Sequence, residues 1–421
     1  MRALTASTLD QINGSAPPAL VDRRRSAFEV FERSSMPTSK DENWKYVELD
    51  LDLDDLALPA GPGERLADDD FISAVSDAAG RAVLVDGFLV ESDHDTGAEF
   101  GSAVEAWSRR TLPGMIDATA DKYAAAALAF AGDGVSLRVP AGVSVDQPFL
   151  VDVQAVTPGA VSFPSITIEV EENAEASVLV VLRSPGDTEV TLVPQVAVRV
   201  GDGARLGVTT AQVLGHGATS VSHHRVETGR DATIRLGEVG LGARFARLDL
   251  GIRLAGTGGS AEVVGIYFGE RDQVLDYRMV IEHVGPNTTS DVFLKGAVED
   301  EAQSVFTGLL RIEEDARRVS AFETNRNLVL SEGAKAHSVP NLEILCNDVI
   351  CGHGSSVGPL EEDHLYYLMS RGLGRERAER VLIRGFFEEV IRRLPGTRLA
   401  APIRSAVDRR FTIAQAEGRV R

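Results

Sequence analysis

The chain has 421 residues with 43 Lys and Arg against 63 Asp and Glu, so its formal net charge is −20. This charge argues against a general binder of nucleic acid or of anionic membranes, because both would be repelled. No run of about 18 apolar residues predicts a transmembrane helix, and the first residues lack the apolar core of a signal peptide. Two cysteines cannot build a disulfide framework, so we expect a cytosolic globular protein.

Residues 1–130 are expected to form an N-terminal mixed or helical domain. Pro17 and Pro18 suit a first helical turn, and apolar residues recur at helical spacing until Pro37. Residues 41–70 then carry 11 acidic side chains and only two basic ones. This composition favours a solvated acidic connector.

Residues 131–358 are expected to form the core, because short apolar or alternating runs are separated there by glycine-rich turns. A corner motif recurs with alanines 30, 28 and 29 residues apart, at Asn173-Ala174, Gly203-Ala204, Asp231-Ala232 and Ser260-Ala261. Gly, Asn and Asp tolerate the positive φ of a tight corner, and alanine fits its crowded inside. The spacing predicts a parallel β-helix (solenoid); a two-sheet sandwich is the alternative.

Residues 359–421 are expected to form a C-terminal helical domain and a basic tail. One short helix is expected over 361–370, and a second carries an apolar stripe listed as Ala378, Val381, Leu382, Phe386, Val390 and Leu394. We expect this hairpin to cap one end of the solenoid. The last 30 residues hold eight arginines against two acidic residues, which favours a loosely ordered tail or, alternatively, one that docks on an acidic protein.

Known catalytic motifs are missing from the sequence. It contains no G-x-x-x-x-G-K-[ST] phosphate loop, so the chain is not itself a P-loop ATPase. A β-solenoid could still be a carbohydrate-active enzyme that uses surface carboxylates. The candidates for that alternative are Glu169, Glu171, Glu172, Glu313, Glu314 and Asp315, which stand at strand–turn junctions and look like ordinary solvated turns.

One segment is chemically dense, because Cys346, Cys351 and His353 lie within eight residues. Thiolate and imidazole ligands suit iron or zinc, although this spacing matches no standard zinc site. If 349–353 is extended, Cys351 and His353 share one strand face, whereas Cys346 falls on the other. The alternative is that both cysteines are small buried apolar residues and the histidine is hydrogen-bonded.

Several segments resemble the SufD branch of the SufB/SufD family of iron–sulfur cluster assembly proteins. They are ENWKY at 42–46, NRNLVLS at 325–331, PNLEI at 340–344, CGHG at 351–354 and LYYLMSRG at 365–372. The resemblance implies a right-handed parallel β-helix flanked by N- and C-terminal helical domains. It also implies a non-catalytic scaffold that pairs with a SufB-like subunit and binds a SufC-like ABC ATPase.

The resemblance assigns roles to particular residues. His353 corresponds to a histidine that faces a SufB cysteine across the subunit interface, where nascent clusters form, and Cys351 is a second candidate iron contact. The SufB cysteine position falls on Ile344, which fits SufD. Contacts to SufC are expected from the C-terminal helices, at Leu365, Tyr366, Arg371 and Phe386. Iron or a cluster would be held only transiently, without a resident cofactor, and whether the isolated chain forms a homodimer stays open.

Overall fold

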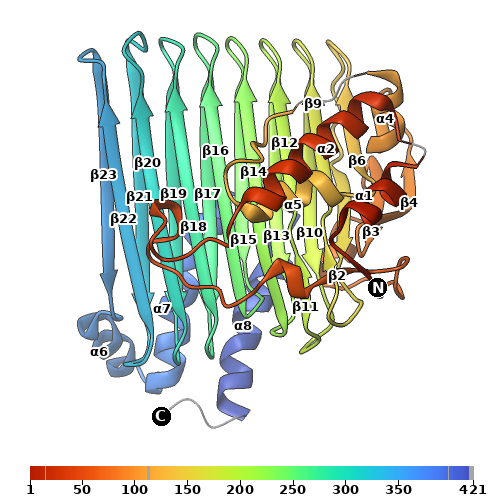
Figure 1. Cartoon of the computed structure of the whole chain (residues 1–421). Coiled ribbons are helices and arrows are strands. Elements are labelled where there is room, and N and C mark those ends of the chain that lie inside the picture. Colours follow the sequence, from red (N-terminus) through yellow and green to blue (C-terminus); the bar gives the residue numbers. More distant parts are fainter. Residues whose placement is uncertain (15, 111–113, 397, 417–421) are drawn as a thin grey trace.

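The fold is a parallel β-solenoid of about eight turns with helices at both chain termini. The computed structural model describes residues 1–14, 16–110, 114–396 and 398–416, with side chains described to residue 410 (Figure 1). Successive strands alternate between two sheets of ten and 11 strands, so that each turn adds one strand to each sheet. The predicted parallel solenoid is therefore confirmed.

The strands of the ten-stranded sheet are, in spatial order, β4 (Phe88–His94), β3 (Gly80–Val85), β7 (Phe149–Gln154), β10 (Glu175–Arg183), β13 (Arg205–Val213), β15 (Thr233–Gly240), β17 (Ser260–Gly269), β19 (Thr289–Val298), β21 (Val319–Val329) and β23 (Val349–Gly358). The strands of the 11-stranded sheet are β5 (Glu99–Ser102), β6 (Gly134–Val139), β9 (Ser165–Val170), β12 (Gln195–Val200), β14 (Ala218–Thr228), β16 (Phe245–Leu254), β18 (Val274–His283), β20 (Gln303–Ile312) and β22 (Lys335–Ile344), with β8 (Val161–Ser162) and β11 (Val190–Leu192) beside them. A small separate sheet pairs β1 (Arg2–Ala3) with β2 (Ala57–Leu58).

The helices lie before and after these strands. The N-terminal ones are α1 (Ala6–Asn13), α2 (Pro18–Arg33), the short η1 (Glu42–Trp44) and η2 (Leu53–Asp55), α3 (Asp70–Ser73), α4 (Ala103–Arg109) and α5 (Lys122–Phe130). The C-terminal ones are α6 (Glu362–Ser370), α7 (Arg375–Arg393) and α8 (Ala400–Ala416). Each helix in the described part of the chain is too short or too polar to span a bilayer.

The corner motif produces the turns as expected at three of its four positions. Asn173, Gly203 and Asp231 have φ values of 56°, 67° and 54°, and the alanine after each is buried inside the solenoid. At the fourth corner the left-handed residue is Gly258, with φ of 75°. Ser260 already pairs with Thr233 inside the sheet, so the fourth motif was placed two residues too late.

Three large apolar cores and one small cluster hold the described part of the molecule together. The first fills the space between the two sheets and runs from β3 to the last turn. The second joins the outer face of the ten-stranded sheet to α3, α7 and α8, where Phe268 and Phe387 have ring centroids 6.1 Å apart. The third joins the outer face of the 11-stranded sheet to α2, α5 and the segment after α2 (Figure 1).

The C-terminal helices do not cap the solenoid, contrary to expectation. They pack against the outer face of the ten-stranded sheet, around β17 and β19, because that face carries the apolar side chains. In the described residues the last turn, made by β22 and β23, therefore has no cover (Figure 1). Ile350, 70% exposed, marks this open end.

The expected loose basic tail is also corrected, because residues 400–416 form α8. Its arginines bind carboxylates of the same chain: Arg404 lies 2.8 Å from Glu388, and Arg409 lies 3.1 Å from Asp70. Just before α8, Arg398 forms an ion pair with Asp77. The last residues of the tail, 417–421, lie outside the described residues.

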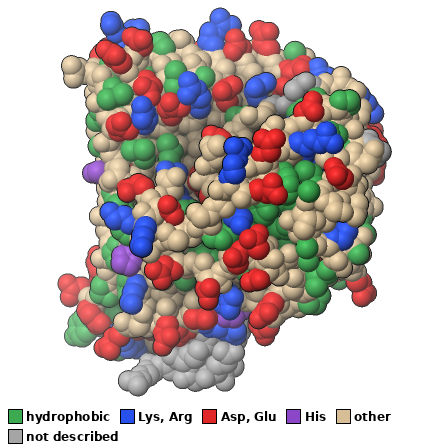
Figure 2. Space-filling model, in the orientation of Figure 1, with side chains coloured by type: hydrophobic (Ala, Val, Ile, Leu, Met, Phe, Trp, Pro, Cys, Tyr) green, Lys and Arg blue, Asp and Glu red, His purple; other side chains and the backbone are tan. Residues whose placement is uncertain are grey.

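The first part of the acidic segment 41–70 is anchored on the 11-stranded sheet. Trp44 is buried, stacks on Tyr123 with ring centroids 5.6 Å apart, and has the Arg247 guanidinium 4.2 Å from its ring centroid. Arg247 also donates a hydrogen bond of 2.5 Å to the Asn43 carbonyl. The carboxylates around it stay at the surface, and Figure 2 shows acidic and basic side chains interspersed over this face.

Candidate functional site

The open end of the solenoid carries Cys351 and His353. Both lie on β23, the edge strand, which pairs only with β21 in the described structure. Val349 and Cys351 pack against the core between the sheets, so alternation along the strand places His353 on the same inward face. Cys351 is half-buried and His353 is exposed, because no further turn covers them.

Cys346 does not join this pair. It lies in the corner between β22 and β23, is buried, and packs as a member of the core between the sheets. Its thiol is therefore placed like a small apolar side chain, and both cysteines are free thiols. Ile344, at the position of the family's SufB cysteine, ends β22 and is 41% exposed.

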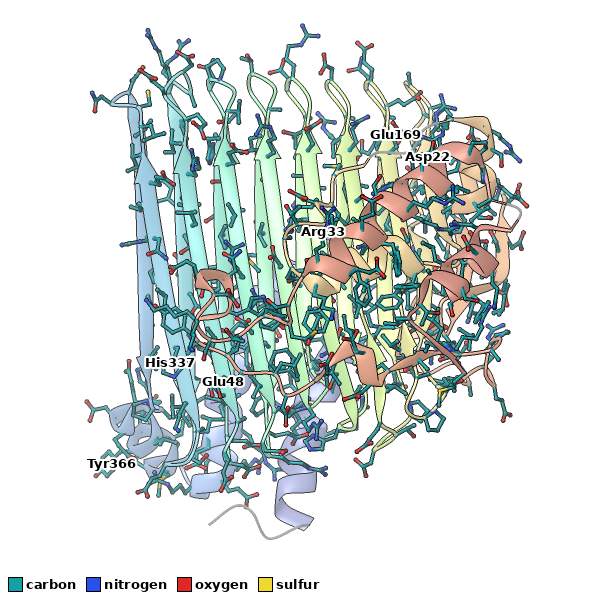
Figure 3. All side chains as sticks on the ribbon, in the orientation of Figure 1. Asp22, Arg33, Glu48, Glu169, His337 and Tyr366 are labelled. Carbon is teal, nitrogen blue, oxygen red and sulfur yellow. The ribbon has the colours of Figure 1, made fainter. Side chains whose placement is uncertain are left out.

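The two histidines that flank this segment in the sequence are directed elsewhere. His337 lies on β22, and Figure 3 shows it on the outer side of the 11-stranded sheet. His364 lies on α6, where its Nδ1 is 3.1 Å from a carboxylate oxygen of Glu361. Among the described residues, no group of three His, Cys, Asp or Glu side chains is arranged to hold a metal ion. The thiol of Cys351 and the imidazole of His353 therefore stand at the open end without a third such side chain beside them in the described residues.

Sequence reasoning missed Glu323, which pairs with His353 in the sheet. Glu323 is only 1% exposed, and neither carboxylate oxygen has a hydrogen-bond partner in the described structure. Burial raises the pKa of Glu323 to about 8. A turn-by-turn alignment could have revealed it, since the equivalent residue of the preceding turn is Val292.

The expected contact residues of the C-terminal helices differ in accessibility. Leu365 is buried, whereas Tyr366 is 76% exposed and points away from the fold at the outer corner of α6 (Figure 3). Arg371 lies over the ring of Tyr367, 5.3 Å from its centroid. Phe386 is half-buried, with Lys295 Nζ 4.5 Å from its ring centroid. Tyr366 and Arg371 are thus the two that a partner can reach directly.

A hollow of about 730 Å³ lies between the α6–α7 hairpin and the outer face of β21 and β23. Gly354, Ser356 and Gly358 present little side chain on this face, so the hairpin does not close over the edge strand. Leu382 and Phe386 line the hollow from the helix side. The open end and the C-terminal hairpin are therefore neighbouring surfaces.

Three of the six carboxylates considered for a carbohydrate-active enzyme form ion pairs with arginines. Glu169 forms ion pairs with Arg110 and Arg199, and Glu171 lies 2.6 Å from Arg138. Glu313 lies 2.6 Å from Arg311. Glu172, Glu314 and Asp315 are exposed at the surface.

Comparison with known proteins places these features in a family. Residues 153–386 match the model of the SufBD core domain of the SUF system for iron–sulfur cluster assembly. The match spans more than half of the chain and includes Glu323, Cys351 and His353. The chain belongs to the SufBD family. Its SufD-like character rests on the relatives described next.

Curated relatives agree with this assignment. An iron–sulfur cluster assembly SufBD family protein of Mycobacterium tuberculosis is 32% identical over 303 residues, which cover 70% of this chain and 75% of the relative. The iron–sulfur cluster assembly protein SufD of Bacillus subtilis is 30% identical over 69% of this chain and 67% of its own length. SufD of Escherichia coli is 25% identical over 90% of both chains.

Proposed function

We propose that this SufBD family protein is a non-catalytic, SufD-like scaffold of a cytosolic Suf complex. It pairs with a SufB-like subunit and binds a SufC-like ATPase, and nascent iron–sulfur clusters form at the SufB–SufD interface. The observation that carries the proposal is His353 on the inward face of an uncovered edge strand, inside the region that matches the family.

The incomplete ligand set supports a shared site. A cluster is usually held by about four thiolate or imidazole ligands. At the open end this chain offers the imidazole of His353 and the thiol of Cys351. A second subunit that adds a strand beside β23 would cover the exposed edge and could bring the missing thiolates.

The C-terminal helices offer a route from an ATPase to this site. Only residues 359–361 separate the end of β23 from the start of α6. A partner that grips Tyr366 and moves α6 would therefore pull on the strand that carries His353. The chain has no phosphate loop of its own, so ATP hydrolysis has to come from the partner.

The test is cluster formation in the reconstituted complex of this chain with its SufB-like and SufC-like partners. His353→Ala should abolish or strongly reduce the cluster absorbance while the complex still co-purifies. His337→Ala is the matched control, because it removes an imidazole from the outer side of β22, which belongs to the other sheet. Unchanged cluster formation by the His353→Ala complex would refute the proposed role. Hydrolysis of a polysaccharide by the isolated chain would instead favour the carbohydrate-active alternative.

A further inference from the structure

One inward-facing row of side chains changes its chemistry at the end of the solenoid. Parallel pairing stacks equivalent residues of successive turns, and five turns in this row carry apolar residues: Val178, Val208, Leu236, Val263 and Val292. The next two residues of the same row are Glu323 and His353. A carboxylate and an imidazole thus follow five buried apolar side chains, next to the open end.

Glu323 occupies a space that the facing strand leaves for it. Its side chain crosses the interior from β21 to Gly308 on β20, where a Cβ atom would collide with both carboxylate oxygens. Gly308 is therefore what allows a long acidic side chain to fit between the sheets. An unpartnered buried carboxyl group destabilises the fold unless a hydrogen bond or a cation compensates it.

The polar groups next to Glu323 are already satisfied by one another. Asn325 Nδ2 donates to the Tyr267 hydroxyl over 3.0 Å, and that hydroxyl donates to Asn327 Oδ1 over 2.6 Å. Asn327 Nδ2 closes the ring by donating to Asn325 Oδ1 over 2.5 Å. This ring does not include Glu323, whose two oxygens have no partner in the described structure. The carboxylate is thus free to act as a ligand.

We propose that Glu323 and His353 together bind a divalent cation of the Fe²⁺ type at the open end of the solenoid. Glu323 supplies the anionic oxygen from the inner turn, and His353 supplies an imidazole nitrogen from the outer turn. Neighbouring strands lie about 4.8 Å apart, so two long side chains in one row can reach a common ion. Carboxylate and imidazole are suitable ligands for iron(II) and cobalt(II).

This inference deepens the proposed function, because it names a second residue that holds iron before or during cluster assembly. The ion would enter from the uncovered end, since only the last turn lies between Glu323 and solvent. The remaining coordination positions stay open to water or to ligands from a second subunit. The pair would thus hold a single iron ion and present it to the interface.

The experiment uses the metal-free full-length chain and Co²⁺, whose visible absorbance reports nitrogen and oxygen ligation, with anaerobic Fe²⁺ titration as the second probe. The wild-type chain should bind one equivalent. Glu323→Gln and Glu323→Met should each weaken binding at least tenfold, and the methionine variant avoids leaving a new buried amide. Glu332→Gln, at an exposed corner, is the matched control and should bind like wild type.

The outcomes separate this inference from the proposed function. Wild-type binding of Co²⁺ and Fe²⁺ by a folded Glu323→Met chain would overturn the inference, even if His353→Ala abolishes cluster formation in the complex. Loss of ion binding in both Glu323 variants would support the site. If neither these variants nor His353→Ala then changes cluster formation, the ion site stands and the proposed function fails.

Discussion

His283 gives a sharp test of the buried polar chemistry inside the solenoid. It is fully buried in β18 between two apolar row neighbours, Leu254 and Ile312. Its Nδ1 lies 2.7 Å from Thr288 Oγ1 and its Nε2 lies 2.9 Å from Ser290 Oγ. Because the Thr288 hydroxyl donates to the Gly285 carbonyl, its oxygen accepts from Nδ1–H, and the Ser290 hydroxyl can donate to Nε2 of a neutral ring.

The expected pH dependence of the free energy of unfolding follows from the pKa of His283, which burial lowers from 6.5 to about 4. The unfolded chain therefore binds a proton between pH 6.5 and 4 that the folded chain does not bind. The contribution of neutral, buried His283 to the free energy of unfolding is therefore fully present above pH 6.5 and is lost as the pH falls toward 4. Between pH 7.5 and 5 the linkage relation gives a loss of about 2 kcal/mol from this residue.

The perturbation is His283→Leu, which continues the apolar row. We expect the free energy of unfolding of the variant, measured by urea denaturation, to fall less between pH 7.5 and 5 than that of the wild-type chain. The difference between the two pH profiles should be about 2 kcal/mol. His364→Leu, at an exposed site on α6, should follow the wild-type profile. Parallel profiles for His283→Leu and wild type would show that His283 ionises freely in the folded protein and would refute the reasoning.

Three further predictions concern packing and contacts. Trp44→Ala removes the contacts with Tyr123 and Arg247, so urea denaturation should show a loss of about 3–5 kcal/mol; a loss below about 1 kcal/mol would contradict the anchoring role. Gly308→Ala should cost about 1–3 kcal/mol because the new Cβ displaces the Glu323 carboxyl, and most of this cost should vanish in a Glu323→Ala background; additive costs would contradict the contact. Tyr366→Ala should leave the free energy of unfolding within about 0.5 kcal/mol of wild type but weaken pull-down of a SufC-like ATPase, and equal pull-down would remove Tyr366 from that surface.

The solenoid could be predicted because each corner is a local event. Asn173, Gly203 and Asp231 adopt positive φ for reasons contained in their own side chains. The bounds of helix α2 were also predictable from nearby residues, since prolines start the helix and a serine–proline segment follows it. The turns nevertheless differ in length, and the motif assigned to Ser260 falls two residues after the corner.

Features that depend on contacts between distant segments were less accessible. The expected apolar stripe of α7 included Val381 and Leu382. The buried residues of α7 instead include Ile383 and Phe387, because the face that carries them is turned toward the sheet. Leu382 is left beside the hollow. Glu323 was not recognised as buried, because without the turn-by-turn alignment a glutamate in a strand is expected at the surface, and the glycine at 308 that makes room for it lies in the opposite sheet. The uncovered end also depended on contacts between distant segments. The C-terminal helices pack on the apolar outer face of the ten-stranded sheet and not on the end of the solenoid.

The ion pairs that tie the last helix to the start of the sheet have a mechanical consequence. Arg398 and Arg409 hold Asp77 and Asp70, residues more than 300 positions earlier in the chain. Helix α8 is held on the ten-stranded sheet by these ion pairs and by buried Ile403 and Val407, whereas α6 follows the edge strand after three residues and packs on α7. A force on α6 would therefore act on β23 through residues 359–361 and on α7 through their shared contacts, while α8 stays fixed on the sheet.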